Sequence, residues 1–270
     1  MLHERVYLDP SDDRVYIDTY IANDKSHLHD AMLVIPGGGY HNVCTDREGE
    51  PIALAYFAKG VNCFVLNYRV GRDGDTYPSQ LIDASRAILH IRENAEKYAV
   101  DPNRVFAVGF SAGGHLAGSL ALLSDEPAVL AELNISAGEN TPDAVVLSYP
   151  VTTMNAPTHQ GSFIHLAGKP YAEIDAATAA RLSLENHVKK SSPPAFIWHT
   201  APDAVVPIAG TFALAKAYTD AGVPMMMHVY PYGPHGLALA NEITLRANPE
   251  SVQPLAEGWV DASLAFLKTV

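Results

Sequence analysis

The chain has 270 residues, of which 48% are hydrophobic, and its formal net charge is −12. A chain of this length and composition can bury one large core, so we expect a single domain over residues 1–270. The acidic balance argues against nucleic acid and anionic membrane surfaces as partners, because the summed field repels phosphate groups.

The first residues of the chain include Glu4 and Arg5, at a point where a secretory signal would need an apolar run. No later run approaches the length of a membrane span. We therefore expect a soluble cytoplasmic protein with no membrane partner, and the sequence is compatible with a homo-oligomer. Cys44 and Cys63 are expected to be free thiols, because so large a core needs no disulfide.

Short apolar runs alternate with longer segments of helical spacing, which indicates an α/β fold with a mostly parallel central sheet flanked by helices. The predicted strands are 14–21, 31–36, 62–68, 104–110, 144–149, 195–200 and 225–230. The predicted helices are 51–59, 78–99, 112–123, 207–221 and 251–267. The stretch 152–190 is too long and too mixed in composition for one crossover helix, so we predict a small cap insertion there.

Three consecutive glycines follow the predicted strand 31–36, in Pro36-Gly37-Gly38-Gly39-Tyr40. Glycine lets the backbone turn its N–H groups toward a ligand. Such a loop can cradle a phosphate, but the chain lacks the G-x-x-x-x-G-K-[ST] motif and a G-x-G-x-x-G that opens a helix. The loop therefore favours an oxyanion hole, in which the N–H groups of Gly38 and Gly39 stabilise a tetrahedral intermediate.

Ser111 lies between the predicted strand 104–110 and the predicted helix 112–123, in the sequence Gly109-Phe110-Ser111-Ala112-Gly113. This G-x-S-x-G motif makes a turn so tight that small residues are needed at both of its ends. A glycine-rich turn without a chemical role is the alternative. The strand before it and the helix after it favour a nucleophilic serine, with the N–H of Ala112 as a further oxyanion donor.

Asp203 follows the predicted strand 195–200, and His235 follows the next strand along the chain. A buried carboxylate at this point can orient an imidazole. The rival carboxylates fit less well, because Asp143 precedes a strand and Asp175 lies in the predicted cap. A helix N-cap near Pro207 is the alternative role for Asp203.

His235 follows the predicted strand 225–230 in a loop with glycines on both sides, which suits a ring that passes protons between a nucleophile and a leaving group. It also completes the order serine, acid, histidine. Three other histidines lie inside predicted helices or strands, where packing or structural hydrogen bonds are more usual: His115, His199 and His228. His27 and His29 lack carboxylates or cysteines at metal-ligand spacing, so we expect no metal and no cofactor.

With these motifs the chain resembles the bacterial acetylesterases related to acetyl-xylan esterases, neighbours of the hormone-sensitive-lipase-like carboxylesterases. The phrases that carry the resemblance, besides the two glycine motifs, are Asn67-Tyr68-Arg69, Phe196-Ile-Trp-His-Thr200, Asp203 with Val206-Pro207, and Gly233-Pro-His-Gly-Leu237. The likeness runs from about the first parallel strand to the end of the chain. Where the lipase-like group has histidine before the glycines, this chain has Pro36.

This resemblance implies the α/β-hydrolase fold and a serine esterase that removes short acyl groups, typically acetyl, from hydroxyls of sugars or xylo-oligosaccharides. It implies catalytic roles for Ser111, Asp203 and His235. It assigns the oxyanion hole to Gly38, Gly39 and Ala112. The partner is then a small-molecule ester.

Five residues are candidates for the substrate pocket: Tyr40, Arg47, Glu48, Phe163 and Tyr171. In the alternative interpretation, Arg47 and Glu48 form a surface ion pair and the two cap aromatics form the core of the cap. Two alternative functions stay open from the residues. The same three catalytic groups serve amidases, formamidases and peptidases, and the scaffold also serves as a catalytically inactive binding module.

Overall fold

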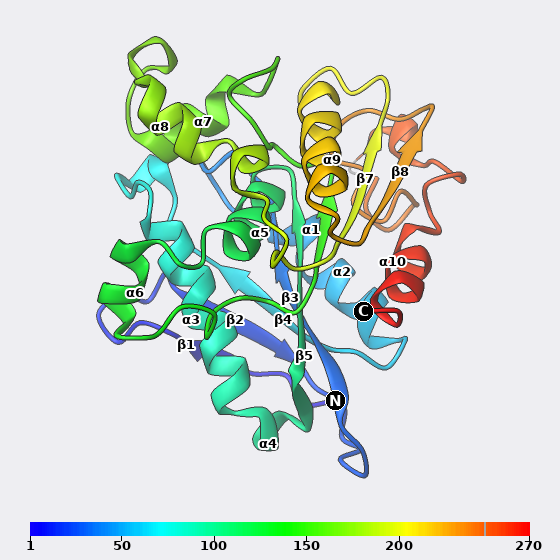
Figure 1. Ribbon diagram of the computed structural model, residues 1–270. Coiled ribbons are helices and arrows are strands. Elements are labelled where there is room, and N and C mark those ends of the chain that lie inside the picture. The colour runs from blue at the N-terminus through cyan, green and yellow to red at the C-terminus, as the bar shows by residue number, and fades with distance from the viewer. Residues whose placement is uncertain (246) are drawn as a thin grey trace.

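The computed structural model describes residues 1–245 and 247–270, and these form an eight-stranded sheet of order β1-β2-β4-β3-β5-β6-β7-β8 (Figure 1). The strands are β1 (Arg5–Tyr7), β2 (Tyr16–Tyr20), β3 (His29–Ile35), β4 (Asn62–Asn67), β5 (Val100–Phe110), β6 (Val145–Ser148), β7 (Ala195–Thr200) and β8 (Met225–Tyr230). The β1–β2 and β2–β4 pairs are antiparallel, and the other neighbours are parallel. The predicted mostly parallel sheet is confirmed.

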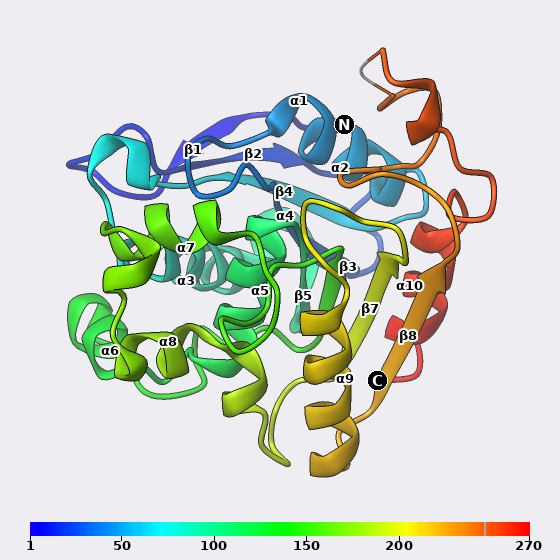
Figure 2. The ribbon, with the colours of Figure 1, turned by 90° about the horizontal axis from the view of Figure 1, so that it is seen from above.

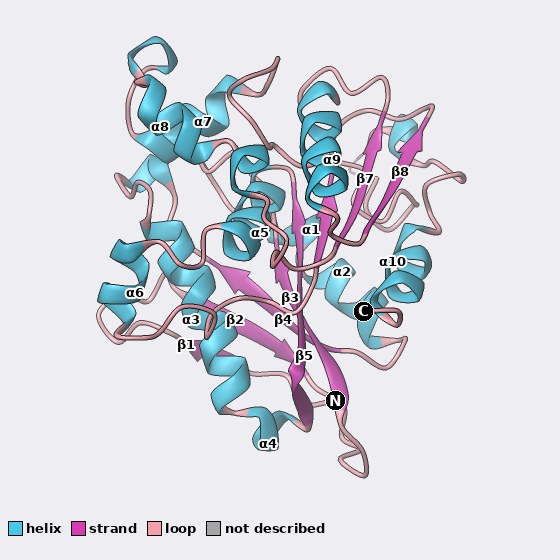
Figure 3. Cartoon of the chain, in the orientation of Figure 1, coloured by secondary structure: helices cyan, strands magenta, loops and turns pink. Residues whose placement is uncertain are grey.

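Helices lie on both sides of this sheet, as Figure 2 shows from above and Figure 3 by element type. The α-helices are α1 (Thr45–Glu48), α2 (Glu50–Phe57), α3 (Ser79–Glu93), α4 (Ala95–Tyr98), α5 (Ala112–Leu122), α6 (Pro127–Leu133), α7 (Gln160–Ala167), α8 (Ala176–Leu182), α9 (Ala209–Ala221) and α10 (Trp259–Leu267). Short 3₁₀ helices span Gly71–Asp73, Tyr171–Glu173, Leu184–His187 and Pro249–Ser251. Within the described ranges no helix is long and apolar enough to cross a bilayer.

The central strand β5 feeds two apolar cores with alternate side chains, because successive residues of a strand point to opposite faces. Val105 and Ala107 pack into the core under α3, α5 and α9, whereas Phe106 and Phe110 pack into the core under α2 and α10. The buried strand β4 contributes to both cores in the same way, and its Cys63 is a free thiol, as is Cys44. The nucleophile candidate thus follows a central strand whose last six residues are all buried.

Several elements and boundaries differ from the prediction, and three of these differences have a clear local cause. Strand β1 was not predicted, because its three residues are mostly exposed and too few to show a period. The predicted helix 78–99 breaks at Asn94, whose side-chain amide donates to the carbonyl of His90 and competes with the helical pattern. The predicted helix 251–267 begins only at Trp259, after Pro254 and Gly258, two residues that disfavour a helix.

The segment 152–190 contains α7, α8 and two 3₁₀ turns rather than one crossover helix, and it lies at the upper left of Figure 1, beside α5. It is joined to the body by apolar contacts, because Phe163, Leu166 and Leu184 are buried in the same core as α3 and α5. Its role as a cap over the site stays a prediction.

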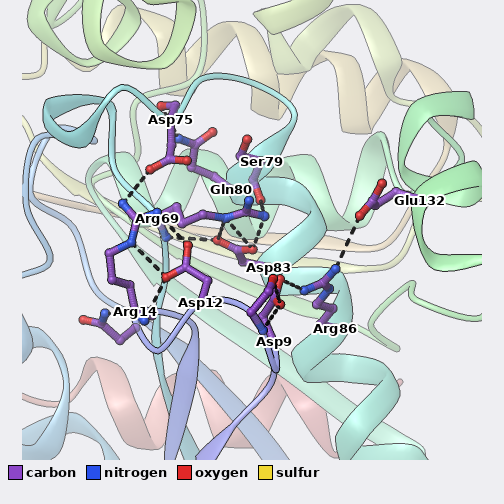
Figure 4. A network of polar contacts seen from close by, with 12 residues as sticks. Asp9, Asp12, Arg14, Arg69, Asp75, Ser79, Gln80, Asp83, Arg86 and Glu132 are labelled. Carbon is purple, nitrogen blue, oxygen red and sulfur yellow. Dashed lines mark hydrogen bonds and ion pairs between the residues drawn. The ribbon is translucent and has the colours of Figure 1, made fainter.

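Arg69, from the phrase Asn67-Tyr68-Arg69, fixes the end of β4 to α3. Its guanidinium lies 2.6 Å from the fully buried carboxylate of Asp83, inside the polar network of Figure 4. Burial raises the pKa of Asp83 above its ordinary value, although the hydrogen bonds from Arg69 oppose this. The neighbouring Tyr68 hydroxyl donates to the carbonyl of Pro36 at 2.7 Å. This phrase therefore anchors the start of the glycine loop.

Candidate active site

Ser111 sits on a strained turn between β5 and α5, with a backbone φ of 54°. Glycine is required two residues before it and two residues after it. A Cβ at Gly109 would lie 2.1 Å from the carbonyl oxygen of Gly113, and a Cβ at Gly113 would lie 2.3 Å from the carbonyl oxygens of Ile35 and Pro36. The predicted need for small residues at both ends of the motif is confirmed.

The structure brings together the three residues predicted as nucleophile, base and acid. The Nε2 atom of His235 lies 2.9 Å from Ser111 Oγ, and its Nδ1 atom lies 2.6 Å from Asp203 Oδ2. Ser111 comes from the β5–α5 turn, whereas Asp203 and His235 come from the loops after β7 and β8. Because a carboxylate only accepts hydrogen bonds, Nδ1 carries the proton, and Nε2 is left free to accept the serine hydroxyl.

Asp203 is held from several sides. Its Oδ1 accepts the backbone N–H groups of Val205 and Val206, each at 2.9 Å. Its Oδ2 also lies 3.2 Å from Nε2 of the buried His199, which donates to the Val206 carbonyl as well. Burial would raise the pKa of Asp203, but the hydrogen bonds from His199 and His235 hold that pKa well below its ordinary value. The carboxylate is therefore ionised at neutral pH.

The alternatives for the acid lie elsewhere. Asp143 accepts the N–H of Val105 at 2.7 Å in the middle of β5, six residues before Ser111. Asp175 is the N-cap of α8. The N-cap of α9 is Ile208, so Asp203 does not have the capping role considered for it.

The glycine loop places free N–H groups next to the serine. Gly38 and Gly39 have φ values of +129° and +65°, and a Cβ at Gly38 would overlap the backbone of Asn42. Over residues 1–245 and 247–270, the N–H groups of Gly38, Gly39 and Ala112 donate to no protein acceptor. Gly38, Gly39, Ser111 and His235 line one pocket of about 340 Å³. These N–H groups are thus available to an oxyanion.

Of the five predicted pocket residues, only Arg47 and Glu48 line this pocket. Tyr40 and Phe163 do not line it, because both rings are buried in the apolar core. Tyr171 packs against that core and also lies outside the pocket. The ion pair of Arg47 with Glu48, at 3.7 Å, is inside the site rather than on the surface, since Glu48 is 1% exposed.

Glu48 joins the glycine loop to the histidine loop. Its Oε2 accepts the N–H of Gly37 at 2.9 Å, and its Oε1 accepts the hydroxyl of Tyr149 at the same distance. The Tyr149 hydroxyl in turn accepts the N–H of Ala238, and its ring packs edge-on against His235 with centroids 5.0 Å apart. Tyr149 was not predicted as a site residue, and its only signal in the sequence is its position at the end of the predicted strand 144–149.

Three further histidines were also missed, and they give the pocket a polar wall: His41, His159 and His165. The Nδ1 atom of His165 donates to the carbonyl of Gly39 at 3.0 Å, because a carbonyl oxygen can only accept. Burial, and next the charge of His235, lower the pKa of His159. Within the described ranges no cluster of histidine, cysteine, aspartate and glutamate is arranged to hold a metal.

Tyr40 and His115 form a buried hydrogen-bonded pair between the glycine loop and α5. The Tyr40 hydroxyl lies 2.8 Å from His115 Nδ1, and His115 Nε2 lies 2.8 Å from the carbonyl of Leu182. Since the carbonyl needs a donor, the neutral ring carries its proton on Nε2 and accepts the tyrosine hydroxyl on Nδ1. The structural role expected for His115 is confirmed, and it links the glycine loop, α5 and the segment 152–190.

His115 is expected to make the protein acid-sensitive. Burial lowers its pKa from 6.5 to about 4, so between these values the unfolded chain binds a proton that the folded chain does not. Protonation of the unfolded chain at His115 therefore leaves the free energy of unfolding almost unchanged well above pH 6.5 and lowers it by about 2 kcal/mol at pH 5. Urea unfolding at pH 7 and pH 5 measures this loss. In His115→Gln, which keeps a donor and an acceptor but does not titrate, the loss between the two pH values should shrink by about that amount; an unchanged loss would contradict the assignment.

The BD-FAE family model matches residues 17–218, well over half of the chain. The chain belongs to the BD-FAE family. This BD-FAE member is 38% identical over 235 residues to endo-1,4-beta-xylanase B of Butyrivibrio fibrisolvens, a match covering 83% of this chain and 36% of that protein. It is 30% identical over 209 residues to an acetylxylan esterase of Xylanibacter ruminicola, covering 76% of this chain and 40% of that protein. It thus spans well under half the length of these curated relatives.

Solved structures match over nearly their whole length. An acetyl ester-xyloside bifunctional hydrolase from Caldicellulosiruptor lactoaceticus is 33% identical, with a TM-score of 0.78 and 97% of each chain covered. The carboxylesterase Cest-2923 of Lactobacillus plantarum is 27% identical, with a TM-score of 0.87, covering 100% of this chain and 98% of that one. The predicted α/β-hydrolase fold and the resemblance to acetyl-xylan esterases are confirmed for this BD-FAE member.

Proposed function

We propose that this chain is a serine esterase that hydrolyses esters of short acyl groups, acetyl above all, on hydroxyls of sugars or xylo-oligosaccharides. The observation that carries the proposal is the continuous array in which His235 contacts Ser111 Oγ at 2.9 Å and Asp203 at 2.6 Å. The names of the relatives, an acetylxylan esterase and an acetyl ester-xyloside hydrolase, support the substrate class.

In the proposed reaction, His235 Nε2 takes the proton of Ser111, and the serine oxygen attacks the ester carbonyl. The N–H groups of Gly38, Gly39 and Ala112 stabilise the resulting oxyanion, and one such donor is worth roughly 3 kcal/mol. His235 then protonates the departing alcohol, and the acyl group stays bonded to Ser111. A water molecule, deprotonated by the same histidine, releases the acid and restores the enzyme.

The size and lining of the pocket support a short acyl group. The pocket has a volume of about 340 Å³, and besides His235 its lining residues include Arg47, Glu48 and the three wall histidines. A long acyl chain would have to desolvate these polar groups without replacing their hydrogen bonds. We therefore expect kcat/KM to fall steeply, roughly tenfold or more, from acetyl to hexanoyl esters.

The test is a set of parallel assays with acetylated xylobiose, p-nitrophenyl acetate, p-nitrophenyl hexanoate and an N-formyl amide. Preference for the acetyl esters, together with fluorophosphonate labelling mapped to the peptide containing Ser111, is the expected result. Faster turnover of the amide would support the amidase alternative. Folded protein that neither hydrolyses an ester nor takes the label would overturn the proposal in favour of a binding module.

A further inference from the structure

A second cavity, of about 620 Å³, adjoins His235 and is named the Tyr232 groove. Val205, Tyr232, His235, Glu250 and Gln253 line it, together with three prolines of the loops after β7 and β8. Val205 and His235 also line the pocket that contains Ser111. The groove therefore adjoins the pocket at the residue that, in the proposed mechanism, protonates the leaving alcohol.

The side chains of the groove combine an aromatic surface with hydrogen-bond acceptors. Tyr232 is 65% exposed, so most of its ring is available for contact. The side-chain amide of Gln253 donates to the backbone carbonyl of Glu250 at 2.8 Å, which fixes its nitrogen and leaves its oxygen as an acceptor. In the described part of the chain, the Tyr232 hydroxyl and the Glu250 carboxylate have no hydrogen-bond or ion-pair partner.

This combination suits a flat ligand with one apolar face and a rim of hydroxyl groups. The apolar C–H face of a pyranose ring can pack on an aromatic ring, while its hydroxyls donate to carboxylate and amide oxygens. A simple alkyl alcohol would pack on the aromatic ring only and would leave the carboxylate and amide oxygens without hydrogen-bond donors. The proposed mechanism adds a second constraint, because the oxygen of the departing alcohol must lie within hydrogen-bond reach of His235.

We infer that the Tyr232 groove binds the alcohol portion of the substrate as a pyranose ring packed on Tyr232. This inference rests on the proposed esterase function and adds to it a location for the sugar. The acyl group then occupies the pocket beside Gly38 and Gly39, and the sugar occupies the adjoining groove that shares Val205 and His235 with this pocket.

The test compares acetylated xylobiose with ethyl acetate, which carries the same acyl group on an alcohol too small to fill the groove. In Tyr232→Ala, the ratio of kcat/KM for the sugar ester to kcat/KM for ethyl acetate should fall about tenfold, mainly through a higher KM for the sugar ester. Tyr232→Phe keeps the ring and should retain most of that ratio. Tyr7→Ala is the matched control, because Tyr7 is a similarly exposed tyrosine on the edge strand β1, and it should change neither rate.

Each outcome bears on the inference separately from the proposed function. If the wild-type protein fails on both substrates, the esterase proposal itself fails. If it hydrolyses ethyl acetate and Tyr232→Ala leaves the ratio unchanged, the esterase stands and the sugar site is overturned. If Tyr232→Ala instead raises KM for ethyl hexanoate and not for the sugar ester, the groove holds the acyl chain, and the inference is again wrong.

Discussion

Replacing Ser111 with alanine is expected to lower kcat for acetyl ester hydrolysis on the order of 10⁵- to 10⁶-fold. The substitution removes the atom that attacks the ester while leaving the free N–H groups of the glycine loop in place. Any remaining turnover would come from polarisation of the carbonyl and from binding. The initial rate with p-nitrophenyl acetate and the loss of fluorophosphonate labelling measure the effect.

The folded state should change little in Ser111→Ala. The Oγ atom contacts His235, and alanine takes the same backbone conformation at φ 54° with the same Cβ. Ser119→Ala provides a matched control, since Ser119 is buried on α5 and its hydroxyl has no hydrogen-bond partner among the residues that the structure describes. That variant should keep full activity. Turnover in Ser111→Ala equal to that of the control would show that the serine is not the nucleophile.

The main features of the fold and the three central side chains were predictable because each depends on local signals. Most of the predicted strands are short apolar runs, and Ser111, Asp203 and His235 each follow a predicted strand. In a parallel sheet these strand ends meet at one edge, so chain order was enough to place the three residues together. Strand β1 carries no such signal, because it is short and exposed.

The supporting contacts were not predictable, because they depend on residues far apart in the chain. Glu48 and Tyr149 are 101 residues apart, and their hydrogen bond exists only once the glycine loop and the β6 strand are in place. Tyr40 lies outside the pocket for a related reason. It adjoins the glycine loop in sequence, but at its φ of 55° its side chain is buried in the core, where it meets His115.

These contacts explain how a loop of three glycines can keep its N–H groups in position. Glycine alone makes the loop flexible, which would add an ordering cost to every turnover. Glu48 fixes Gly37, Tyr68 fixes Pro36, and His165 fixes the carbonyl of Gly39. The N–H groups of Gly38 and Gly39 are therefore the parts of the loop that stay available to the substrate.

Replacing Asp203 with asparagine is expected to lower kcat about 10⁴-fold while leaving the fold intact. Both carboxylate oxygens of Asp203 face donors: the N–H groups of Val205 and Val206 on Oδ1, and His235 and His199 on Oδ2. The backbone N–H groups cannot give up their protons, so the amide must turn its oxygen toward them. Its NH₂ group then faces His235 Nδ1, which must become an acceptor, and His199 Nε2, which keeps only its hydrogen bond to the Val206 carbonyl.

This change moves the proton of His235 from Nδ1 to Nε2, the atom that lies 2.9 Å from Ser111 Oγ. A ring protonated there cannot take the proton of the serine, so attack on the ester is blocked even though every heavy atom keeps its place. NMR of the imidazole ¹⁵N resonances reports the tautomer directly, and steady-state assays report kcat. Asp175→Asn is the control, because asparagine also caps α8 at that position, and activity should be unchanged. A large loss of kcat in Asp203→Asn with the proton still on Nδ1 would contradict this explanation.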